Sequence, residues 1–485
     1  MSHIEEPTKF PQLANLSRRS LLGLGGSLSA GLLLSACGGN SAGGSTGGSA
    51  NSSAAGSTNS SAGGAAGSSG GTSAGVAAGS SAQASVKSGS TITVWDPTYK
   101  AGQPTFDKSA DAIDKLFTEK FGVTVNHQAQ PFADYDKLLQ AAFTGRTGPD
   151  VTLMLPGSQG VLRWKKGLTD LTPGAQGLRD QLKFWDATSP SFTATGNTYG
   201  IPIDTVGLVF YYNKKIFRAA GLDPEVAPAT FAELTATADK LKAKGIVPFA
   251  SGNKEGYENQ WWLSILWSGS QSVADSVSLA KREIPLDDPR FGDVLQKYNQ
   301  LQQAGYFSSN RFSAPLFTDG VAAFSQGKGA MFLGLSSSGA DWSVFNKALG
   351  QENVGYFQAP GIGKAKADSL PVTASYVWSS PSFSSNVDAA RAYVLFTGST
   401  EAQQIQYDTA KLFPNNKNVK LTGAAPQLVG MFKDFQSRPV FEGAHQLLPG
   451  TVLTQYTTLT NEYLQGRTAL TDMLKQLQAT NKRAN

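Results

Sequence analysis

After its N-terminal part, the chain alternates short apolar runs with segments in which apolar residues recur at helical spacing. Residues 91–95, 123–125 and 151–155 have the short or alternating apolar pattern of strands. Between them, the segments around Ile113 and Leu139 carry apolar residues three and four positions apart, as one face of a helix does. Strands that alternate with helices in this way are typical of an α/β layer with a mainly parallel sheet. We therefore predict an α/β fold.

The longest apolar run, residues 206–212, follows a turn that contains Gly and Pro. A run without polar residues predicts a strand that helices cover on both faces. Asn213 ends the run, and a short helix is predicted from there to Gly221. Asp204 and Thr205 lie where a loop enters this strand, and we expect them to face a cleft.

Polar and aromatic side chains follow other predicted strands. Ligands bind α/β sheets at the carboxyl ends of the strands, which makes Trp95, Asp96 and Gln159 candidates. A site for a sugar needs planar aromatic faces beside groups that donate and accept hydrogen bonds, because a sugar presents hydroxyls at its rim and C–H groups on its faces. Loops with this composition supply the further candidates Tyr257, Glu258, Trp261, Ser336, Ser337, Ser375 and Tyr376.

These candidates compete with structural alternatives. Tryptophan is most often a core residue, and we expect Trp262 and Trp267 in the core. For Trp261, ligand contact and core packing both remain open. Asp204 and Glu258 have the alternative of solvated loop carboxylates.

The rarest residues limit the chemistry that the body of the chain can perform. Cys37 is the only cysteine, so no disulfide or catalytic thiol is expected beyond it. His127 and His445 lie in no metal-binding motif, and the sequence has no phosphate-binding loop or dinucleotide fingerprint. The formal net charge is +5, without a dense Lys/Arg cluster that would indicate nucleic acid. We expect no metal, no cofactor and no nucleic-acid partner.

The N-terminal part has the composition of an export signal followed by a tether. Ser17-Arg18-Arg19-Ser20-Leu21-Leu22 resembles a twin-arginine signal, and Leu34-Ser35-Ala36-Cys37 resembles a bacterial lipobox. The Gly/Ser/Ala-rich stretch that follows cannot bury enough apolar surface to offset its ordering entropy. We predict a signal peptide at residues 1–36, and a lipidated Cys37 with a flexible tether to residue 88.

An ordered series of motifs resembles the extracellular solute-binding proteins of ABC importers. Within them, it is similar to the large carbohydrate-binding family that includes maltose-binding protein. The series runs from about residue 91 to the C-terminus, and its main segments are YGIPIDTVGLVFYYNKKIFRAAGL at 199–222, FSQGKGAM at 324–331, AARAYVLFT at 389–397, EAQQ at 401–404, LFP at 412–414 and GRT at 466–468.

The resemblance implies a two-lobe fold of the periplasmic-binding-protein type II class. Each lobe would be a mixed, mainly parallel sheet flanked by helices, with a hinge between the lobes. The implied N-lobe takes residues 89–203 and 372–425, and the C-lobe takes residues 204–371 and 426–485.

The resemblance also implies function. The protein would be a monomer that does no chemistry, binds a carbohydrate and delivers it to an ABC permease, held outside the cytoplasm by the lipid on Cys37. Two tryptophans of maltose-binding protein fall here on Ser336 or Ser337 and near Leu453, which favours a smaller or differently shaped glycan than maltodextrin.

Two other functions remain open. The same scaffold could carry a non-sugar solute, such as a polyamine, a phosphate compound or a metal chelate. A surface enzyme that cleaves glycans would need two carboxylates facing one bond, and Asp204 with Glu258 would be the pair to test.

Overall fold

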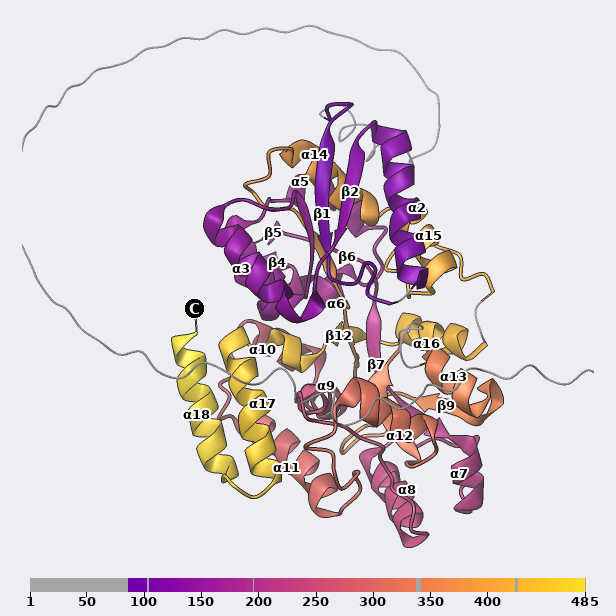
Figure 1. Cartoon of the computed structure of the whole chain (residues 1–485). Coiled ribbons are helices and arrows are strands. Elements are labelled where there is room, and N and C mark those ends of the chain that lie inside the picture. The colour runs from indigo at the N-terminus through magenta and orange to yellow at the C-terminus, as the bar shows by residue number, and fades with distance from the viewer. Residues whose placement is uncertain (1–85, 103, 195, 337–341, 424–425, 485) are drawn as a thin grey trace, which may run out of the picture. The chain divides into compact units, whose positions relative to one another are not determined.

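The computed structural model describes residues 86–102, 104–194, 196–336, 342–423 and 426–484. The predicted signal peptide, Cys37 and nearly all of the tether lie outside these residues. Two principal sheets and the helices that flank them form the described body (Figure 1). None of the described helices combines the length and apolar character needed to span a membrane.

The first sheet has the strand order β2-β1-β3-β11-β6. β1 is parallel to β2 and β3, whereas β11 is antiparallel to β3 and β6. In β1, Ile92 and Val94 are buried on one face, as the alternating pattern predicts. The strands are β1 (Thr91–Asp96), β2 (Thr124–Ala129), β3 (Val151–Met154), β6 (Ile201–Pro202) and β11 (Val377–Ser379).

Helices α2, α14 and α15 lie against one another and beside this sheet (Figure 1). The ring of Phe117 meets Tyr393 edge-on at 5.1 Å, which joins α2 to α14. The helices in this part of the chain are α2 (Pro104–Phe121), α3 (Tyr135–Gly145), α4 (Val161–Trp164), α5 (Thr172–Arg179), α6 (Trp185–Thr188), α14 (Val387–Thr397) and α15 (Thr400–Ala410); a small ribbon pairs β4 (Thr193–Ala194) with β5 (Asn197–Thr198).

The second sheet has the order β12-β10-β7-β8, and β9 also pairs with β7. β10 is parallel to β12, and β7 is antiparallel to β8, β9 and β10. β7 is buried at every position, which confirms the strand predicted from its apolar run. The strands are β7 (Val206–Asn213), β8 (Met331–Leu335), β9 (Val354–Phe357), β10 (Leu370–Thr373) and β12 (Val440–Glu442).

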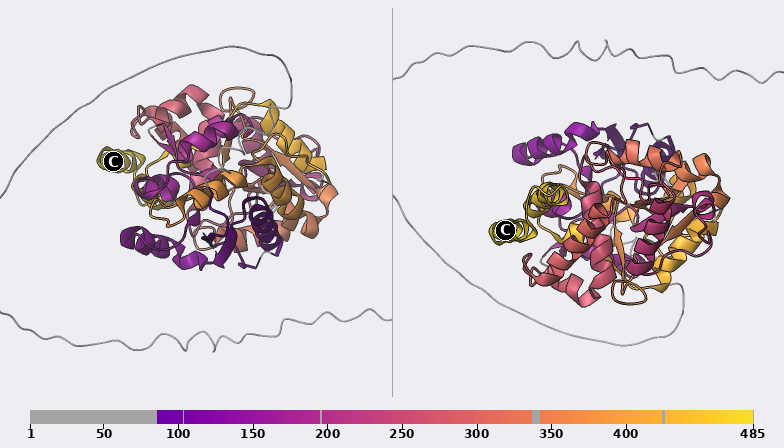
Figure 2. Two further views of the ribbon diagram at one scale, coloured as in Figure 1. Left: turned by 90° about the horizontal axis from the view of Figure 1, so that it is seen from above. Right: turned by 90° about the horizontal axis from the view of Figure 1, so that it is seen from below.

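Helix α9 (Tyr257–Ser270) packs against β10, α11 and α17. Views from above and below show the last helix, marked C, at the edge of the described body (Figure 2). The other helices of this part are α7 (Lys214–Ala219), α8 (Phe231–Ala243), α10 (Val273–Ala280), α11 (Pro289–Gln303), α12 (Val321–Ser325), α13 (Ser343–Leu349), α16 (Pro426–Ser437), α17 (Gly450–Leu464) and α18 (Leu470–Arg483).

Two separate hydrophobic cores correspond to the two sheets. The chain leaves the first sheet through β6 and enters the second through β7; it returns through β10 and β11. The outgoing and returning strands run in opposite directions, so β7 is antiparallel to β10 and β6 to β11. Both sheets are therefore mixed, with more antiparallel pairing than the sequence led us to expect.

Candidate ligand-binding site

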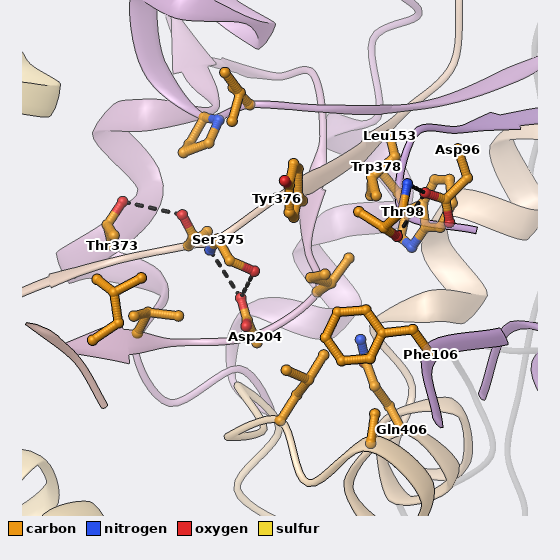
Figure 3. Close-up of a pocket in the computed structure, with 18 of the residues that line it drawn as sticks. Asp96, Thr98, Phe106, Leu153, Asp204, Thr373, Ser375, Tyr376, Trp378 and Gln406 are labelled. Atoms are coloured by element: carbon orange, nitrogen blue, oxygen red, sulfur yellow. Dashed lines mark hydrogen bonds between the residues drawn. The ribbon is translucent and has the colours of Figure 1, made fainter. Parts of the chain in front are cut away.

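A cavity of about 620 Å³ is bordered by residues from both cores. This volume lies within the range of about 300–1,000 Å³ that is typical of small-molecule sites. Figure 3 shows the part of its wall that carries Asp96, Phe106, Asp204, Tyr376 and Trp378. Residues of the segments that form the second core border the cavity on its other side: Tyr257, Gln260, Trp261, Phe317, His445 and Gln446.

Exposed apolar side chains gather at this cavity. Phe132 is 61 % exposed, Phe317 47 %, and Leu155 and Val344 40 % each, and all four border the cavity. Of the large exposed hydrophobic residues in the described ranges, only Val226 lies elsewhere. Exposed apolar side chains that gather in one hollow indicate a binding site, whereas single exposed apolar residues scattered over a surface do not.

Helix α9 places one face on the cavity and the other in the core. Tyr257, Gln260 and Trp261 border the cavity, as residues three and four positions apart on one helix face can. Trp261 is 5 % exposed and meets the Phe317 ring edge-on at 5.9 Å. Phe317 projects from a single π-helical turn, Leu316–Gly320, a backbone form frequent at functional sites.

Asp204 lies where the chain crosses from the first sheet to the second, and it is fully buried. Its Oδ1 accepts hydrogen bonds from the Ser375 backbone N–H at 2.9 Å and from the Ser375 hydroxyl at 2.7 Å. Its Oδ2 has no hydrogen-bond partner among the described residues. Burial raises the pKa of Asp204 to about 6, against the lowering effect of the two Ser375 hydrogen bonds.

Asp96, at the end of β1, has its carboxylate fully engaged. Oδ1 accepts from the Thr98 N–H at 2.6 Å, the Thr98 hydroxyl at 2.7 Å and the Tyr99 N–H at 3.2 Å. Oδ2 lies 3.3 Å from Nε2 of His127, whose Nδ1 lies 2.8 Å from Asp114 Oδ2. Burial alone would lower the pKa of His127, but the hydrogen bonds with Asp114 and Asp96 raise it to about 9. The two carboxylates therefore favour the protonated form of His127, which faces Asp96.

Tyr376 lies on the wall between these two carboxylates (Figure 3). Burial raises the pKa of its hydroxyl, and the neighbouring Asp96, Tyr257 and Asp204 raise it further. Because Tyr257 belongs to α9 and Tyr376 to the returning crossing, aromatic groups from both parts of the chain come close here.

The structure brings seven of the predicted site residues to the cavity: Asp96, Gln159, Asp204, Tyr257, Trp261, Ser375 and Tyr376. They come from segments that are distant in sequence, because the cavity is bordered by loops at the ends of both sheets. Trp262 and Trp267 are buried in the core, as predicted.

Two other predicted site residues, Trp95 and Thr205, do not border the cavity. Trp95 points to the opposite face of β1 from Asp96, and its indole donates to Gln128 at 3.2 Å. The Thr205 hydroxyl hydrogen-bonds to Asn415, and its N–H donates to the Phe413 carbonyl at 3.0 Å. Each makes contacts within the fold.

Glu258 and Ser336 are also away from the cavity, and Ser337 lies outside the described residues. Glu258 is on the core face of α9, where it pairs with Arg311 at 3.0 Å. The Ser336 hydroxyl accepts from the Gly207 N–H at 2.8 Å. Asp204 and Glu258 consequently do not face one bond, as the glycan-cleaving alternative would require.

The sequence analysis missed the apolar rim and several polar residues. Trp378 could have been predicted, because it lies two positions after Tyr376 and therefore on the same side of an extended segment. Phe106, Phe132 and Phe317 lie at a helix start or in irregular segments, where no periodic pattern distinguishes them. His445, whose Nδ1 lies 2.6 Å from the Ser264 hydroxyl, also borders the cavity.

The family described as bacterial extracellular solute-binding protein matches residues 112–433. Among relatives, an uncharacterized ABC transporter extracellular-binding protein of Pyrococcus horikoshii is 27 % identical over 214 residues, which cover 42 % of this chain and 44 % of that protein. The sn-glycerol-3-phosphate-binding periplasmic protein UgpB of Escherichia coli is 39 % identical over 85 residues, 16 % of this chain and 18 % of that protein. The chain thus spans less than half the length of these relatives.

Among solved structures, a chitin oligosaccharide binding protein superposes with a TM-score of 0.68 at 23 % identity, covering 81 % of this chain and 98 % of that one. This likeness shows a shared fold and confirms the predicted two-lobe α/β architecture. Because the family match extends over more than half of its residues, the chain belongs to the bacterial extracellular solute-binding proteins.

Proposed function

We propose that this protein is a lipid-anchored receptor that captures a carbohydrate and delivers it to an ABC permease. The observation that carries the proposal is the cavity wall, which combines aromatic faces with amide side chains. Trp261 and Phe317 border the cavity from one part of the chain, and Tyr376 and Trp378 from the other. Four glutamines, which both donate and accept hydrogen bonds, complete it: Gln159, Gln260, Gln406 and Gln446.

The lobes assigned from the sequence, residues 89–203 with 372–425 and residues 204–371 with 426–485, would close on the sugar. The two cores and the two crossings, at residues 203–205 and 374–376, support a division into two lobes, although Phe184, Val372 and Phe413 of the assigned N-lobe pack in the second core. Hydrogen bonds from Ser375 to Asp204, and from the Ile203 N–H to the Tyr376 carbonyl at 3.1 Å, join the crossings to each other. Closure is a shift of population toward the liganded state, and it needs no chemical step.

Delivery and anchoring rest on the family and on the sequence. The family relatives include an ABC transporter binding protein, and the lipobox-like segment that ends at Cys37 would carry the lipid. The closed protein would present its sugar to a permease from the outer side of the membrane. A chitin oligosaccharide binding protein with the same fold supports a carbohydrate as the class of ligand.

A thermal-shift screen against mono- and oligosaccharides tests the proposal, because a ligand that binds only the native state raises the melting temperature. The best sugar is then titrated by calorimetry into the wild type and Trp261→Ala. We expect Trp261→Ala to weaken binding about 10- to 100-fold, since about 1.4 kcal/mol corresponds to a factor of ten. Trp164→Ala is the matched control, because Trp164 does not border the cavity and stacks on Phe143.

Mass spectrometry of the sugar after incubation separates binding from cleavage. The proposal predicts that the sugar is recovered intact. No binding by any sugar, or cleaved products, would overturn it.

A further inference from the structure

The charged side chains that border the cavity are acidic, and His127 pairs with one of them. Asp96 and Asp204 are the carboxylates among the described residues that border it, and no lysine or arginine borders it. Fixed charge of one sign at the wall of a low-dielectric hollow favours a ligand of the opposite sign and disfavours one of the same sign. Cationic and neutral solutes are therefore favoured over anionic ones.

Helix α2 adds acidic groups beside the cavity. Asp107 accepts from the Lys100 N–H at 2.7 Å and Asp111 from the Tyr99 hydroxyl at 2.7 Å, both in the loop that follows β1. Asp114 lies 2.8 Å from Nδ1 of His127 in β2. His127 pairs with Asp96 and Asp114, and the Lys100 ammonium lies 4.9 Å from the centre of the Tyr99 ring. The acidic groups on this side of the cavity are therefore partly balanced by neighbouring cations.

Asp204 is the carboxylate at the cavity without a cationic partner. Asp96 already has His127 and three hydrogen-bond donors, whereas Asp204 has only Ser375. Its Oδ2 is buried and unpartnered within the described part of the chain. A buried charge in this state is unfavourable unless a donor or a cation meets it. A ligand in the cavity is one source of such a donor.

We propose that the cavity selects a carbohydrate that carries a protonated amino group, with the Asp204 carboxylate as the counter-ion of that group. This inference rests on the proposed function and names its substrate class. The ammonium would donate to the Oδ2 that Ser375 leaves free, while the aromatic faces of Trp261 and Tyr376 contact the sugar ring. A neutral hydroxyl at the same place would make a weaker hydrogen bond, because charge-assisted hydrogen bonds are roughly twice as strong as neutral ones.

Basic side chains do occur in a neighbouring groove. Arg163, Lys165 and Arg282 border it, and it shares Gln159 and Tyr257 with the cavity. Arg163 is paired with Asp136 at 2.7 Å, and Arg282 donates to the carbonyls of Ala484 and Asn481. An anionic solute is therefore included in the test as the competing ligand.

The experiment compares sugars that differ in their amino groups. The full chain is titrated by calorimetry at pH 7.5 with glucosamine and glucose, galactosamine and galactose, and the trimers of β-1,4-linked glucosamine, N-acetylglucosamine and glucose. sn-Glycerol-3-phosphate serves as the anionic probe. In at least one set we expect the amine to bind at least about tenfold more tightly than its neutral counterparts. Added salt should reduce this difference in affinity.

Asp204→Asn tests the assignment of the counter-ion. It should reduce the preference for the amine over its neutral counterparts to about threefold or less, and this ratio is the readout whatever happens to the affinity for neutral sugars. Glu119→Gln removes the same charge from an exposed pair with Lys115 and should keep the full preference. Thermal unfolding checks that both variants fold. If Asp204→Asn does not fold, the comparison of amino and neutral sugars with the wild-type protein still tests the preference for the amine.

The outcomes separate the two claims. If neutral sugars bind as tightly as, or more tightly than, their amines in every set that binds, this inference is overturned and the proposed function stands. If no sugar binds and sn-glycerol-3-phosphate does, the proposed function itself is overturned. An undiminished preference for the amine in Asp204→Asn would reject Asp204 as the counter-ion.

Discussion

Asp204 and Glu258 are both buried carboxylates, 0 % and 1 % exposed, and the sequence predicted both as ligand contacts. Asp204 lies on a crossing between the two sheets and borders the cavity with one oxygen unpartnered. Glu258 lies on α9 one residue after Tyr257, and it pairs with Arg311 on the core side of the helix. Neighbouring residues of a helix point in directions about 100° apart, so Tyr257 borders the cavity while Glu258 pairs with Arg311 in the core.

The difference shows that burial of a carboxylate is a weak guide to function until its partner is known. Glu258 has a fully buried arginine, which also contacts Tyr298 and the face of Phe307. Asp204 has only neutral hydrogen-bond donors. Glu258 has a cation inside the fold, whereas Asp204 has no cationic partner among the described residues. The following variants test this contrast.

Arg311→Met should have the largest effect, on stability alone. It leaves Glu258 buried without its cation, and breaking such a pair typically costs about 3–5 kcal/mol. Urea denaturation measures the loss, and sugar affinity should stay within about twofold if the pair is purely structural. The double variant Arg311→Met with Glu258→Gln should recover part of the stability. A loss of affinity without a loss of stability would place this pair in the site.

His127→Gln should change how stability depends on pH. In the wild type the folded pKa of His127, about 9, exceeds its ordinary value of 6.5, so its contribution is complete below pH 6.5 and is lost as the pH rises through 9. This corresponds to about 3 kcal/mol over that window, at 1.36 kcal/mol per pKa unit. Denaturation curves at pH 6, 7.5 and 9.5 should show this decline in the wild type and a flatter profile in the variant. Identical profiles would contradict an imidazolium between Asp96 and Asp114.

Asp204→Asn should stabilise the unliganded protein at neutral pH. The folded pKa of Asp204, about 6, lies above its ordinary value of 3.8, so the buried charge lowers stability as the pH rises from 4 to 6, and the penalty persists above that. Removing the charge should raise the unfolding free energy at pH 7.5 by about 2 kcal/mol. This is less than the full shift implies, because the amide NH2 would stand where Oδ2 has no partner among the described residues. At pH 4 the variant and the wild type should be nearly equal. Destabilisation at pH 7.5 would assign Asp204 a structural role like that of Glu258.

Phe132→Ala should have the smallest effect, on affinity alone. Phe132 is 61 % exposed at the cavity rim, so its removal leaves no core void. We expect about three- to tenfold weaker sugar binding, from an aromatic contact of about 1 kcal/mol, with an unchanged melting temperature. Val226→Ala, at a 66 % exposed residue away from the cavity, is the control and should change neither quantity. Equal affinities of the two variants would remove Phe132 from the site.

Most of the α/β architecture could be predicted, because periodicity and the ordered motifs reflect local burial. β7 was predicted from an apolar run that is buried at every position. The share of antiparallel pairing was underestimated, because it depends on the directions in which the chain crosses between the sheets.

The site was predicted in part, and the errors have physical reasons. Asp204 and Tyr376 border the cavity where the chain crosses between the sheets, and Trp261 borders it from α9 while packing in the second core. Glu258 was misplaced because the sequence does not show which face of α9 meets the core, nor that the distant Arg311 would pair with it. Phe132 and Phe317 were missed because exposed aromatics in irregular segments carry no periodic signal.

A crystal structure of the protein with its best-screened sugar tests the central claim most directly. The account predicts the sugar in the cavity, with a ring against Trp261 and a donor within hydrogen-bond distance of Asp204 Oδ2, while Glu258 remains paired with Arg311. A sugar bound in the groove beside Arg163, with Asp204 Oδ2 still unpartnered, would contradict it.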